Sequence, residues 1–192
     1  GWTSGTNTSK YLKAFKVDLF LSANEEDVKI ALQSGVAAAK ILPSTSRVRK
    51  SKGDQVRIAF DGDAVLFSKE SEEIYQAQGL EGFINHEKIN RNNPLAQGPF
   101  AKLLMTISKI QEKFQDKPSP IRTALVTARG APTHERVIKT LDLWKVRIDE
   151  AFFLGGSEKY EILDAFGADI FFDDQDTHLN LSTSVVPSAK VY

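Results

Sequence analysis

Seven short apolar runs recur along the chain and predict β-strands, because β-branched and aromatic residues are frequent in them. The predicted strands cover residues 17–21, 38–42, 56–60, 123–126, 151–154, 170–172 and 189–192. The run at 56–60 is continuous rather than alternating, which is typical of a strand buried on both faces. Helical patterns lie between most of these runs. This alternation indicates an α/β fold built on a doubly wound parallel sheet with helices on both faces.

Residues typical of helix ends support three of the predicted helices, at 24–35, 133–144 and 157–167. Asn24, Thr133 and Ser157 carry side-chain oxygens that can accept the first free backbone N–H groups of a helix. Gly35 and Gly167 follow two of these helices, where glycine is favoured because the chain adopts a left-handed conformation. The helices therefore fit between the predicted strands.

One interval between strands is too long for a simple crossover. About 65 residues separate Asp61 from Val126, whereas a strand-helix-strand unit needs roughly 30. The excess predicts an insertion, and residues 68–99 are polar and mostly helical in pattern. We expect a small helical cap there, placed over the ends of the strands, where it excludes water and contacts a ligand.

The two ends of the chain resemble each other weakly. Residues 11–24 align with 162–175, and residues 35–42 align with 185–192 after a slip of one residue. Ser22 and Ala23 stand where the second copy has Asp173 and Asp174, and Thr8 stands where it has Lys159. Chance similarity is one explanation, and a degenerate duplication is the favoured one. We therefore divide the chain into the tail of an upstream half (1–50) and a catalytic domain (51–192).

The amino-acid composition excludes several classes of function. The chain has 192 residues, 41% of them hydrophobic, which suits one core with an insertion. Lysine plus arginine and aspartate plus glutamate number 25 each, so no net field attracts nucleic acid or an anionic membrane. Without cysteine, thiol catalysis and disulfides are excluded. We expect a cytoplasmic protein, because neither a membrane span nor a signal peptide is visible in the sequence.

The sequence with the most chemical information is Asp61-Gly62-Asp63, which directly follows the apolar run at 56–60. Residues i and i+2 of an extended segment point the same way, so the two carboxylates converge. They repel each other unless a cation or a proton is shared between them. A solvated turn would also explain this tripeptide if it stood alone.

Three further polar clusters follow predicted strands in order: Thr127-Ala128-Arg129, then Lys159, then Asp173-Asp174. Ligands of open α/β sheets gather at the carboxyl ends of the strands. Phosphoryl transfer needs a nucleophile, a metal, donors for the phosphate oxygens and an acid for the leaving oxygen. Carboxylates, a lysine and a threonine hydroxyl followed by backbone N–H groups supply the nucleophile, the ligands for a metal, the donors and the acid.

These motifs, DGDAVLF, LVTAR, the lone Lys159 and FFDD, resemble in their order the four motifs of the haloacid dehalogenase superfamily of phosphotransferases. The longer strings FDGDAVLFS, HEK, PLAQGPF, PIRTALVTAR and IFFDDQ resemble the cytosolic 5′-nucleotidase I family. The resemblance covers residues 11–192. It implies the fold of the haloacid dehalogenase superfamily, with the cap inserted after the first catalytic strand.

The resemblance also implies roles for three catalytic residues. Asp61 would be the nucleophile that forms an aspartyl phosphate. Asp63 would protonate the leaving nucleoside oxygen and then activate the water that hydrolyses the intermediate. Lys159 would stabilise the charge on the phosphate and on Asp61.

A magnesium ion is the cofactor that the resemblance implies. Asp61, Asp173 and Asp174 would bind Mg²⁺ with the main-chain oxygen of Asp63, and which of Asp173 and Asp174 touches the metal directly is left open.

The resemblance also implies contacts to the substrate, and two of these residues have alternative explanations. Thr127 would bind phosphate together with Ala128 and Arg129, and Arg129 is equally well explained as a surface residue. Phe67 is a candidate platform for the nucleoside base, with a core or cap-hinge position as the alternative.

The function implied is a magnesium-dependent 5′-nucleotidase that hydrolyses nucleoside 5′-monophosphates, with AMP as the expected substrate. Two alternatives remain: a phosphatase for another small monoester, and a nucleotide-binding module that is inactive because an N-terminal half is absent. We expect no nucleic acid or membrane partner. Unpaired strand edges favour a homo-oligomer or contact with that N-terminal half.

Overall fold

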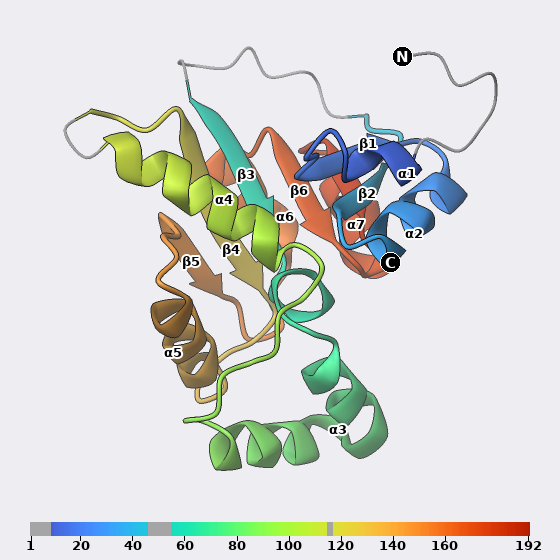
Figure 1. Cartoon of the computed structure of the whole chain (residues 1–192). Helices are drawn as coiled ribbons and strands as arrows, with labels where there is room; N and C mark the ends of the chain where they lie inside the picture. The colour runs from blue at the N-terminus through green and yellow to red at the C-terminus, as the bar shows by residue number, and fades with distance from the viewer. Residues whose placement is uncertain (1–8, 46–54, 115–116) are drawn as a thin grey trace.

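The computed structural model describes residues 9–45, 55–114 and 117–192, and it contains a seven-stranded sheet in the order β1-β2-β7-β6-β3-β4-β5 (Figure 1). The strands are β1 (Leu19–Ser22), β2 (Ala37–Ile41), β3 (Val56–Phe60), β4 (Ile121–Thr127), β5 (Glu150–Phe153), β6 (Ile170–Asp173) and β7 (Ser188–Lys190). The α-helices are α1 (Ser9–Leu12), α2 (Glu25–Gln33), α3 (Glu70–Ile89), α4 (Ala101–Gln111), α5 (His134–Trp144), α6 (Lys159–Phe166) and α7 (Asp176–Ser182). The predicted α/β fold is confirmed.

The sheet is mixed rather than wholly parallel, which corrects the sequence prediction. Strands β2 and β7 pair antiparallel, and every other neighbouring pair is parallel. The alternation of strands and helices predicts parallel neighbours within each unit, and it carries no information on how two units join. The antiparallel pair is the seam between the two ends of the chain.

The predicted helix ends are largely correct. Asn24 caps α2, since its side chain accepts hydrogen bonds from the backbone N–H groups of Glu26 and Asp27. Thr133 precedes α5 as expected, although its hydroxyl donates to the carbonyl oxygen of Gly130 instead of capping the helix. The start predicted at Ser157 is wrong, because α6 begins at Lys159 with Glu158 at the N-cap.

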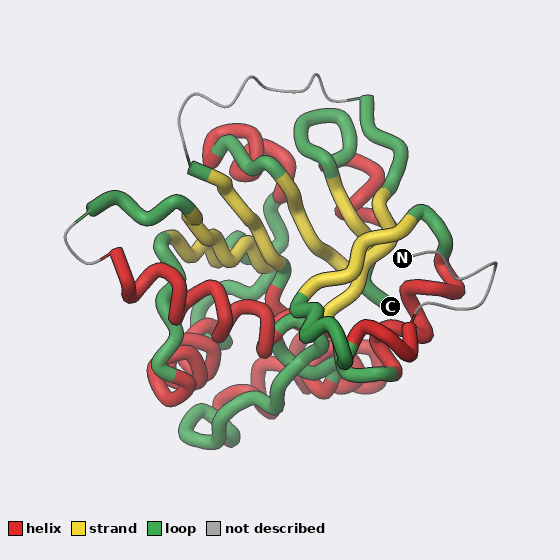
Figure 2. Tube along the Cα trace, turned by 45° about the horizontal axis from the view of Figure 1, so that its top comes forward, coloured by secondary structure: helices red, strands yellow, loops and turns green. Residues whose placement is uncertain are grey.

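Helices cover both faces of the sheet, as Figure 2 shows. One face carries a core in which Phe60, Leu125 and Phe172 pack against apolar residues of α4 and α5. The other face carries a core of Ala59, Val126 and their neighbours against α6. Successive residues of a strand point to opposite faces, so continuous apolar runs supply both cores.

The centre of the sheet brings two segments that are distant in sequence side by side. Strand β3 pairs with β4 on one edge and with β6 on the other, and Phe60 lies opposite Phe172. The chain therefore leaves β3 in one direction and returns on its other side, which makes this a topological switch point where α/β proteins bind ligands. The residues that directly follow Phe60 and Phe172 are Asp61 and Asp173.

The weak internal repeat has a structural counterpart. The two segments form the same succession, α1-β1-α2-β2 and α6-β6-α7-β7. Lys40 pairs with Lys190 across the antiparallel seam, and these two residues are equivalent in the repeat. A local pseudo-two-fold axis therefore passes between them, which supports a duplication. Thr8 and the predicted division near residue 50 lie outside the described residues.

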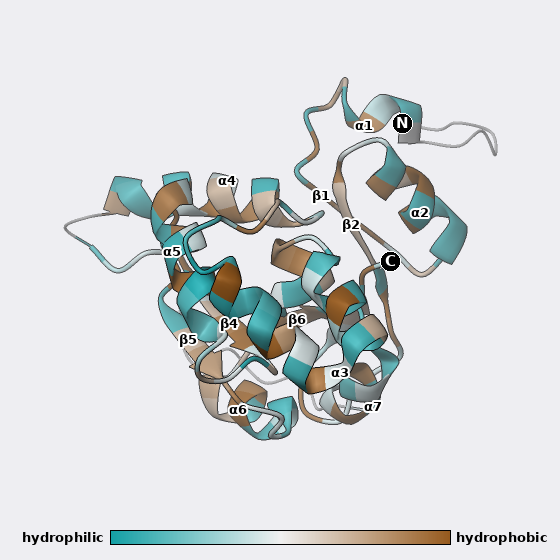
Figure 3. Cartoon of the chain, turned by 90° about the horizontal axis from the view of Figure 1, so that it is seen from below, coloured by the Kyte–Doolittle hydropathy of each residue, from teal (hydrophilic) through white to brown (hydrophobic). Residues whose placement is uncertain are grey.

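The insertion after β3 is a cap that lies beyond the carboxyl ends of the central strands. Figure 1 shows the arrows of β3 and β4 pointing to the side on which α3 lies. Seen from that side, α3 carries both hydrophilic and hydrophobic residues (Figure 3). Helix α3 is interrupted at Gly79, whose φ of 68° is left-handed. Within the described ranges, no helix combines the length and apolar character needed to cross a membrane.

Two short segments fasten the cap to the core. The outgoing segment, Val65–Ser68, and the returning segment, Ala96–Phe100, are joined by three backbone hydrogen bonds: Ser68 N–H to Ala96 O (2.9 Å), Gly98 N–H to Leu66 O (2.8 Å) and Phe100 N–H to Val65 O (2.9 Å). A Cβ atom at Gly98 would lie 2.3 Å from the carbonyl oxygen of Phe67 and 2.6 Å from that of Val65. Only glycine therefore allows the two segments to approach this closely.

Replacing Gly98 with alanine is expected to lower the free energy of unfolding by about 3 kcal/mol, because backbone cannot move away as a flexible side chain can. The measurement is denaturant unfolding of Gly98→Ala and of a control, Gln97→Ala, at the neighbouring position. The side chain of Gln97 is exposed, so its truncation removes no buried contact. Equal stability of the two variants would show that the crossing of the segments is not tight.

Candidate active site

Three carboxylates meet where β3 and β6 end. Asp61 follows β3, Asp173 is the last residue of β6, and Asp174 follows it. One oxygen from each lies within 4.8 Å of the others. Asp61 and Asp173 are buried, and the backbone N–H of Asp61 donates to the carbonyl oxygen of Phe172 at 2.8 Å. The sheet register thus places the acids that the sequence separates by more than 100 residues.

A buried lysine compensates part of this negative charge. The Nζ atom of Lys159 lies 2.6 Å from Oδ1 of Asp61 and 2.7 Å from Oδ2 of Asp173. Lys159 is the first residue of α6 and is only 2% exposed. Burial alone would lower the pKa of Lys159, but the charges of Asp61 and Asp173 outweigh it and hold that pKa above its ordinary value. Lys159 therefore stays charged.

The single charge of Lys159 does not balance the negative charge of the three acids. Burial, with repulsion from Asp173, raises the pKa of Asp61 to about 7 despite the attraction of Lys159. The same two causes raise the pKa of Asp174 to about 6. Burial opposes ionisation of Asp173 as well, but His178 and Lys159 lower its pKa below the ordinary value. A further cation at this point would favour the ionised form of all three acids.

The donor set suits a hard divalent cation. Carboxylate oxygens are ligands that Mg²⁺ prefers, and Asp61, Asp173 and Asp174 present them together. Within the described part of the chain, Oδ1 of Asp174 is buried and has no hydrogen-bond partner. A buried polar atom of this kind is accounted for by an ion or a water molecule. The three acids therefore fit the predicted metal site, and its specificity for magnesium is not fixed by this geometry.

The loop after Asp61 carries the second acid of the motif. Residues Gly62–Leu66 form a turn closed by a hydrogen bond from the backbone N–H of Phe67 to the carbonyl oxygen of Gly62 at 2.9 Å, and Ala64 within it has a left-handed φ of 60°. A Cβ at Gly62 would lie 3.2 Å from the hydroxyl oxygen of Thr127, so the loop passes close to the end of β4. The Thr127 hydroxyl accepts a hydrogen bond from the backbone N–H of Arg129 at 3.3 Å. Thr127 is thereby held beside the acids.

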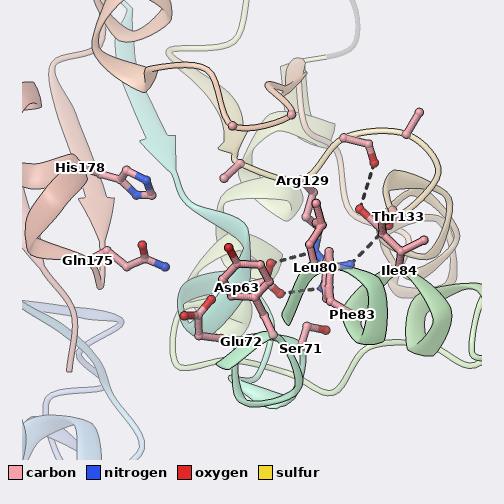
Figure 4. Close-up of a pocket in the computed structure, with 16 residues that line it drawn as sticks. Asp63, Ser71, Glu72, Leu80, Phe83, Ile84, Arg129, Thr133, Gln175 and His178 are labelled. Carbon is pink, nitrogen blue, oxygen red and sulfur yellow. Dashed lines mark hydrogen bonds and ion pairs between the residues drawn. The ribbon is translucent and has the colours of Figure 1, made fainter. Parts of the chain in front are cut away.

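Asp63 is bound by an arginine and is not one of the three clustered carboxylates. The Nε and Nη2 atoms of Arg129 donate to the two carboxylate oxygens of Asp63 at 2.8 and 2.7 Å (Figure 4). Two parallel hydrogen bonds of this type fix both orientation and distance. Burial alone would lower the pKa of Arg129, but Asp63 and Glu87 raise it far above its ordinary range.

A cavity of about 520 Å³ opens beside Asp63 and Arg129. Its cap wall includes the apolar and aromatic residues Tyr75, Leu80, Phe83 and Ile84 of α3, and the ring of Phe83 lies 5.3 Å from the Arg129 guanidinium. Figure 4 shows Leu80, Phe83 and Ile84 on one side of Asp63, with Gln175 and His178 on the other. The cavity thus has an aromatic wall and a polar wall, with Asp63 between them.

The structure brings most of the predicted site residues together. Those at the strand ends, in the cavity wall or at the start of α6 are Asp61, Asp63, Thr127, Ala128, Arg129, Lys159, Asp173 and Asp174. Their catalytic roles stay predictions. Phe67 is a correction: it is fully buried, its ring packs 5.5 Å from that of Trp144, and it is absent from the cavity wall. It belongs to the alternative core or hinge position.

Sequence reasoning missed several residues that complete the site. Glu87 belongs to a segment with a polar, helical sequence. An acid in such a segment is normally solvated, so the sequence did not indicate a role for it. His178 follows Asp173 by five residues, and its Nδ1 lies 3.2 Å from Oδ2 of Asp173. Its place on the helix after the FFDD motif was the available signal, because that helix starts at the acidic site. Tyr75 and Phe83 gave no signal beyond their position in the cap.

The fold and the site together define an α/β protein whose acids and lysine are gathered at a switch point beneath a cap. The model of the 5′-nucleotidase family matches residues 1–192, and the chain belongs to that family. It is 42% identical over 182 residues to a human protein, cytosolic 5′-nucleotidase 1B. The match covers 92% of this chain and 30% of that relative, so the chain spans less than a third of its length. No solved structure gives a significant match.

The pH dependence of stability should show the contribution of Glu87. Burial alone would raise the pKa of Glu87, but Arg129 and Arg136 hold it below its ordinary value. A carboxyl with a lowered pKa stabilises the fold above its unfolded pKa, about 4.3, and this contribution is lost as pH falls through the folded pKa. Glu87→Gln should therefore cost about 3 kcal/mol at pH 7 and progressively less below pH 4.

Urea unfolding between pH 3 and pH 7 measures this difference, and Glu73→Gln is the matched control on the same helix, because its side chain is 61% exposed. A constant difference between wild type and Glu87→Gln over the whole range would contradict the assignment.

Proposed function

We propose that this chain forms the catalytic part of a magnesium-dependent 5′-nucleotidase, which hydrolyses nucleoside 5′-monophosphates, AMP first among them, to nucleoside and phosphate. The observation that supports it most directly is Lys159 between Asp61 and Asp173, next to Asp174. Family membership and the name of the human relative agree with this substrate class. The relative is named as cytosolic, and we propose the cytosol for this protein too.

The first half-reaction transfers the phosphoryl group to the protein, as the resemblance to the haloacid dehalogenase superfamily implies. An oxygen of Asp61 attacks phosphorus, the bond from phosphorus to the 5′ oxygen breaks, and Asp63 gives a proton to that oxygen. The Thr127 hydroxyl donates to a phosphate oxygen, and Lys159 balances the charge on Asp61 and phosphate. A bound magnesium ion, held by Asp61, Asp173, Asp174 and the main-chain oxygen of Asp63, would supply positive charge for the phosphate.

The second half-reaction restores the protein. Asp63 takes a proton from a water molecule as its oxygen attacks the phosphorus of the aspartyl phosphate, and the bond to Asp61 breaks. Phosphate then leaves, and Asp61 is a free carboxylate again. Asp63 has a place in both steps because it lies at the cavity, where the leaving nucleoside and the entering water both pass.

The cavity offers a place for the nucleoside. Its volume of about 520 Å³ is in the range of small-molecule sites. Tyr75 and Phe83 on the cap lie with ring centroids 6.2 Å apart and provide aromatic surface for a base. The polar wall with Gln175 and His178 supplies hydrogen-bonding groups for the ribose or the phosphate.

Replacing the nucleophile should abolish turnover. Asp61→Asn removes the carboxylate that forms the covalent bond, so the release of phosphate from AMP should fall by at least about 10³-fold. Removal of divalent cations with a chelator should also stop turnover, and added Mg²⁺ should restore it. A phosphate-release assay measures both effects.

The same assay separates the alternatives. AMP, IMP, deoxynucleotides and sugar phosphates are compared at one concentration, with Asp142→Asn, at an exposed position of α5, as the control variant. Faster hydrolysis of sugar phosphates would favour a different phosphatase. Undiminished turnover by Asp61→Asn, or after complete metal removal, would contradict the mechanism.

A further inference from the structure

The cap helix carries a buried acid that no step of the proposed reaction uses. The carboxylate of Glu87 on α3 is fully buried. Its Oε2 accepts from Nη1 of Arg129 at 2.5 Å, and its Oε1 accepts from Nη1 of Arg136 at 2.9 Å and from the hydroxyl of Ser71 at 3.0 Å. His86 Nδ1 lies 3.2 Å from the same Oε1. Four side chains therefore contact this one buried carboxylate.

Arg129 connects this acid to the reaction. One edge of its guanidinium, Nε and Nη2, holds Asp63, while Nη1 binds Glu87 and the carbonyl oxygen of Thr133. The guanidinium is planar and rigid, so fixing Nη1 fixes the direction in which the other edge points. Glu87 therefore determines where the carboxylate of Asp63 is held, although the two acids do not touch.

Glu87 is the charged partner that Arg129 has on the cap. Arg129 is buried and contacts two carboxylates, Asp63 of the core loop and Glu87 of the cap. Without Glu87, Nη1 of Arg129 would keep only the carbonyl oxygen of Thr133 at 3.3 Å as its partner. The cap would then no longer hold the guanidinium that binds Asp63.

We propose that Glu87 is a positioning residue for phosphoryl transfer, which acts through Arg129 to hold Asp63 toward the leaving oxygen of the substrate. The inference rests on the proposed function. It also couples the cap to the chemistry, because Glu87 belongs to α3 of the cap and Asp63 belongs to the core loop. Arg129 is thus a link within the protein as well as a residue of the cavity wall.

The test is a double-mutant cycle in the full chain, saturated with Mg²⁺, in which radiolabelled AMP makes slow phosphate release measurable. Glu87→Gln should lower kcat by about 30-fold and change KM by less than about 3-fold, since it misplaces an acid without removing a substrate contact. In the Asp63→Asn background, the same substitution should lower kcat by less than about 2-fold, because the residue through which it acts is gone.

Two variants keep the result interpretable. Glu87→Asp retains the charge but withdraws the carboxylate by one methylene group; it should lose about 5-fold in kcat, and it replaces Glu87→Gln in the cycle if that variant does not fold. Glu73→Gln, exposed on the same helix, should leave kcat unchanged.

A kcat of both Glu87 variants within 2-fold of the wild-type value overturns the inference. Equal losses in the wild-type and Asp63→Asn backgrounds also overturn it, since they indicate a purely structural role. A wild-type protein that releases no phosphate from AMP instead refutes the proposed function, and the inference fails with it.

Discussion

The ion bridge from Lys159 to Asp61 and Asp173 is the interaction on which the rest of the site depends. Buried carboxylates at this distance repel each other, and the fold tolerates them because a buried lysine lies between two of them. The register of β3 and β6 places the acids, and the start of α6 places the lysine. The remaining deficit of positive charge, which is reflected in the raised pKa values of Asp61 and Asp174, suits the three acids to hold a cation.

A second set of buried charges connects the cap to this centre. Asp63, in the turn that follows Asp61, pairs with Arg129, and Arg129 pairs with Glu87 of the cap. The cap is therefore joined to the core by backbone hydrogen bonds at its base and by the ion pair of Arg129 and Glu87. A cap held at both places can shape the cavity for a substrate and align the acid that serves it.

The sequence predicts those parts of the structure that depend on local pattern. Strand β3 has the predicted ends, since a mostly apolar run stops at Asp61. The acids come together because strand ends meet at one edge of a sheet, and Lys159 joins them from the start of α6. The antiparallel seam was not predictable, because it depends on contacts between units. Glu87 was not predictable either, because its partners, Arg129 and Arg136, lie 42 and 49 residues away. Phe67 is an aromatic residue close to the acidic motif, which is typical of a ligand contact. Only its packing shows that it belongs to the core.

The central claim is that Asp61 carries the phosphoryl group during turnover. It is tested most directly by mixing Asp63→Asn, which should retain the intermediate, with AMP that carries a radiolabelled phosphate, quenching in acid and mapping the label by peptide mass spectrometry. The account predicts label on the peptide that contains Asp61, and none in Asp61→Asn. Label on another residue, or phosphate release from AMP with no labelled protein at any time, would contradict it.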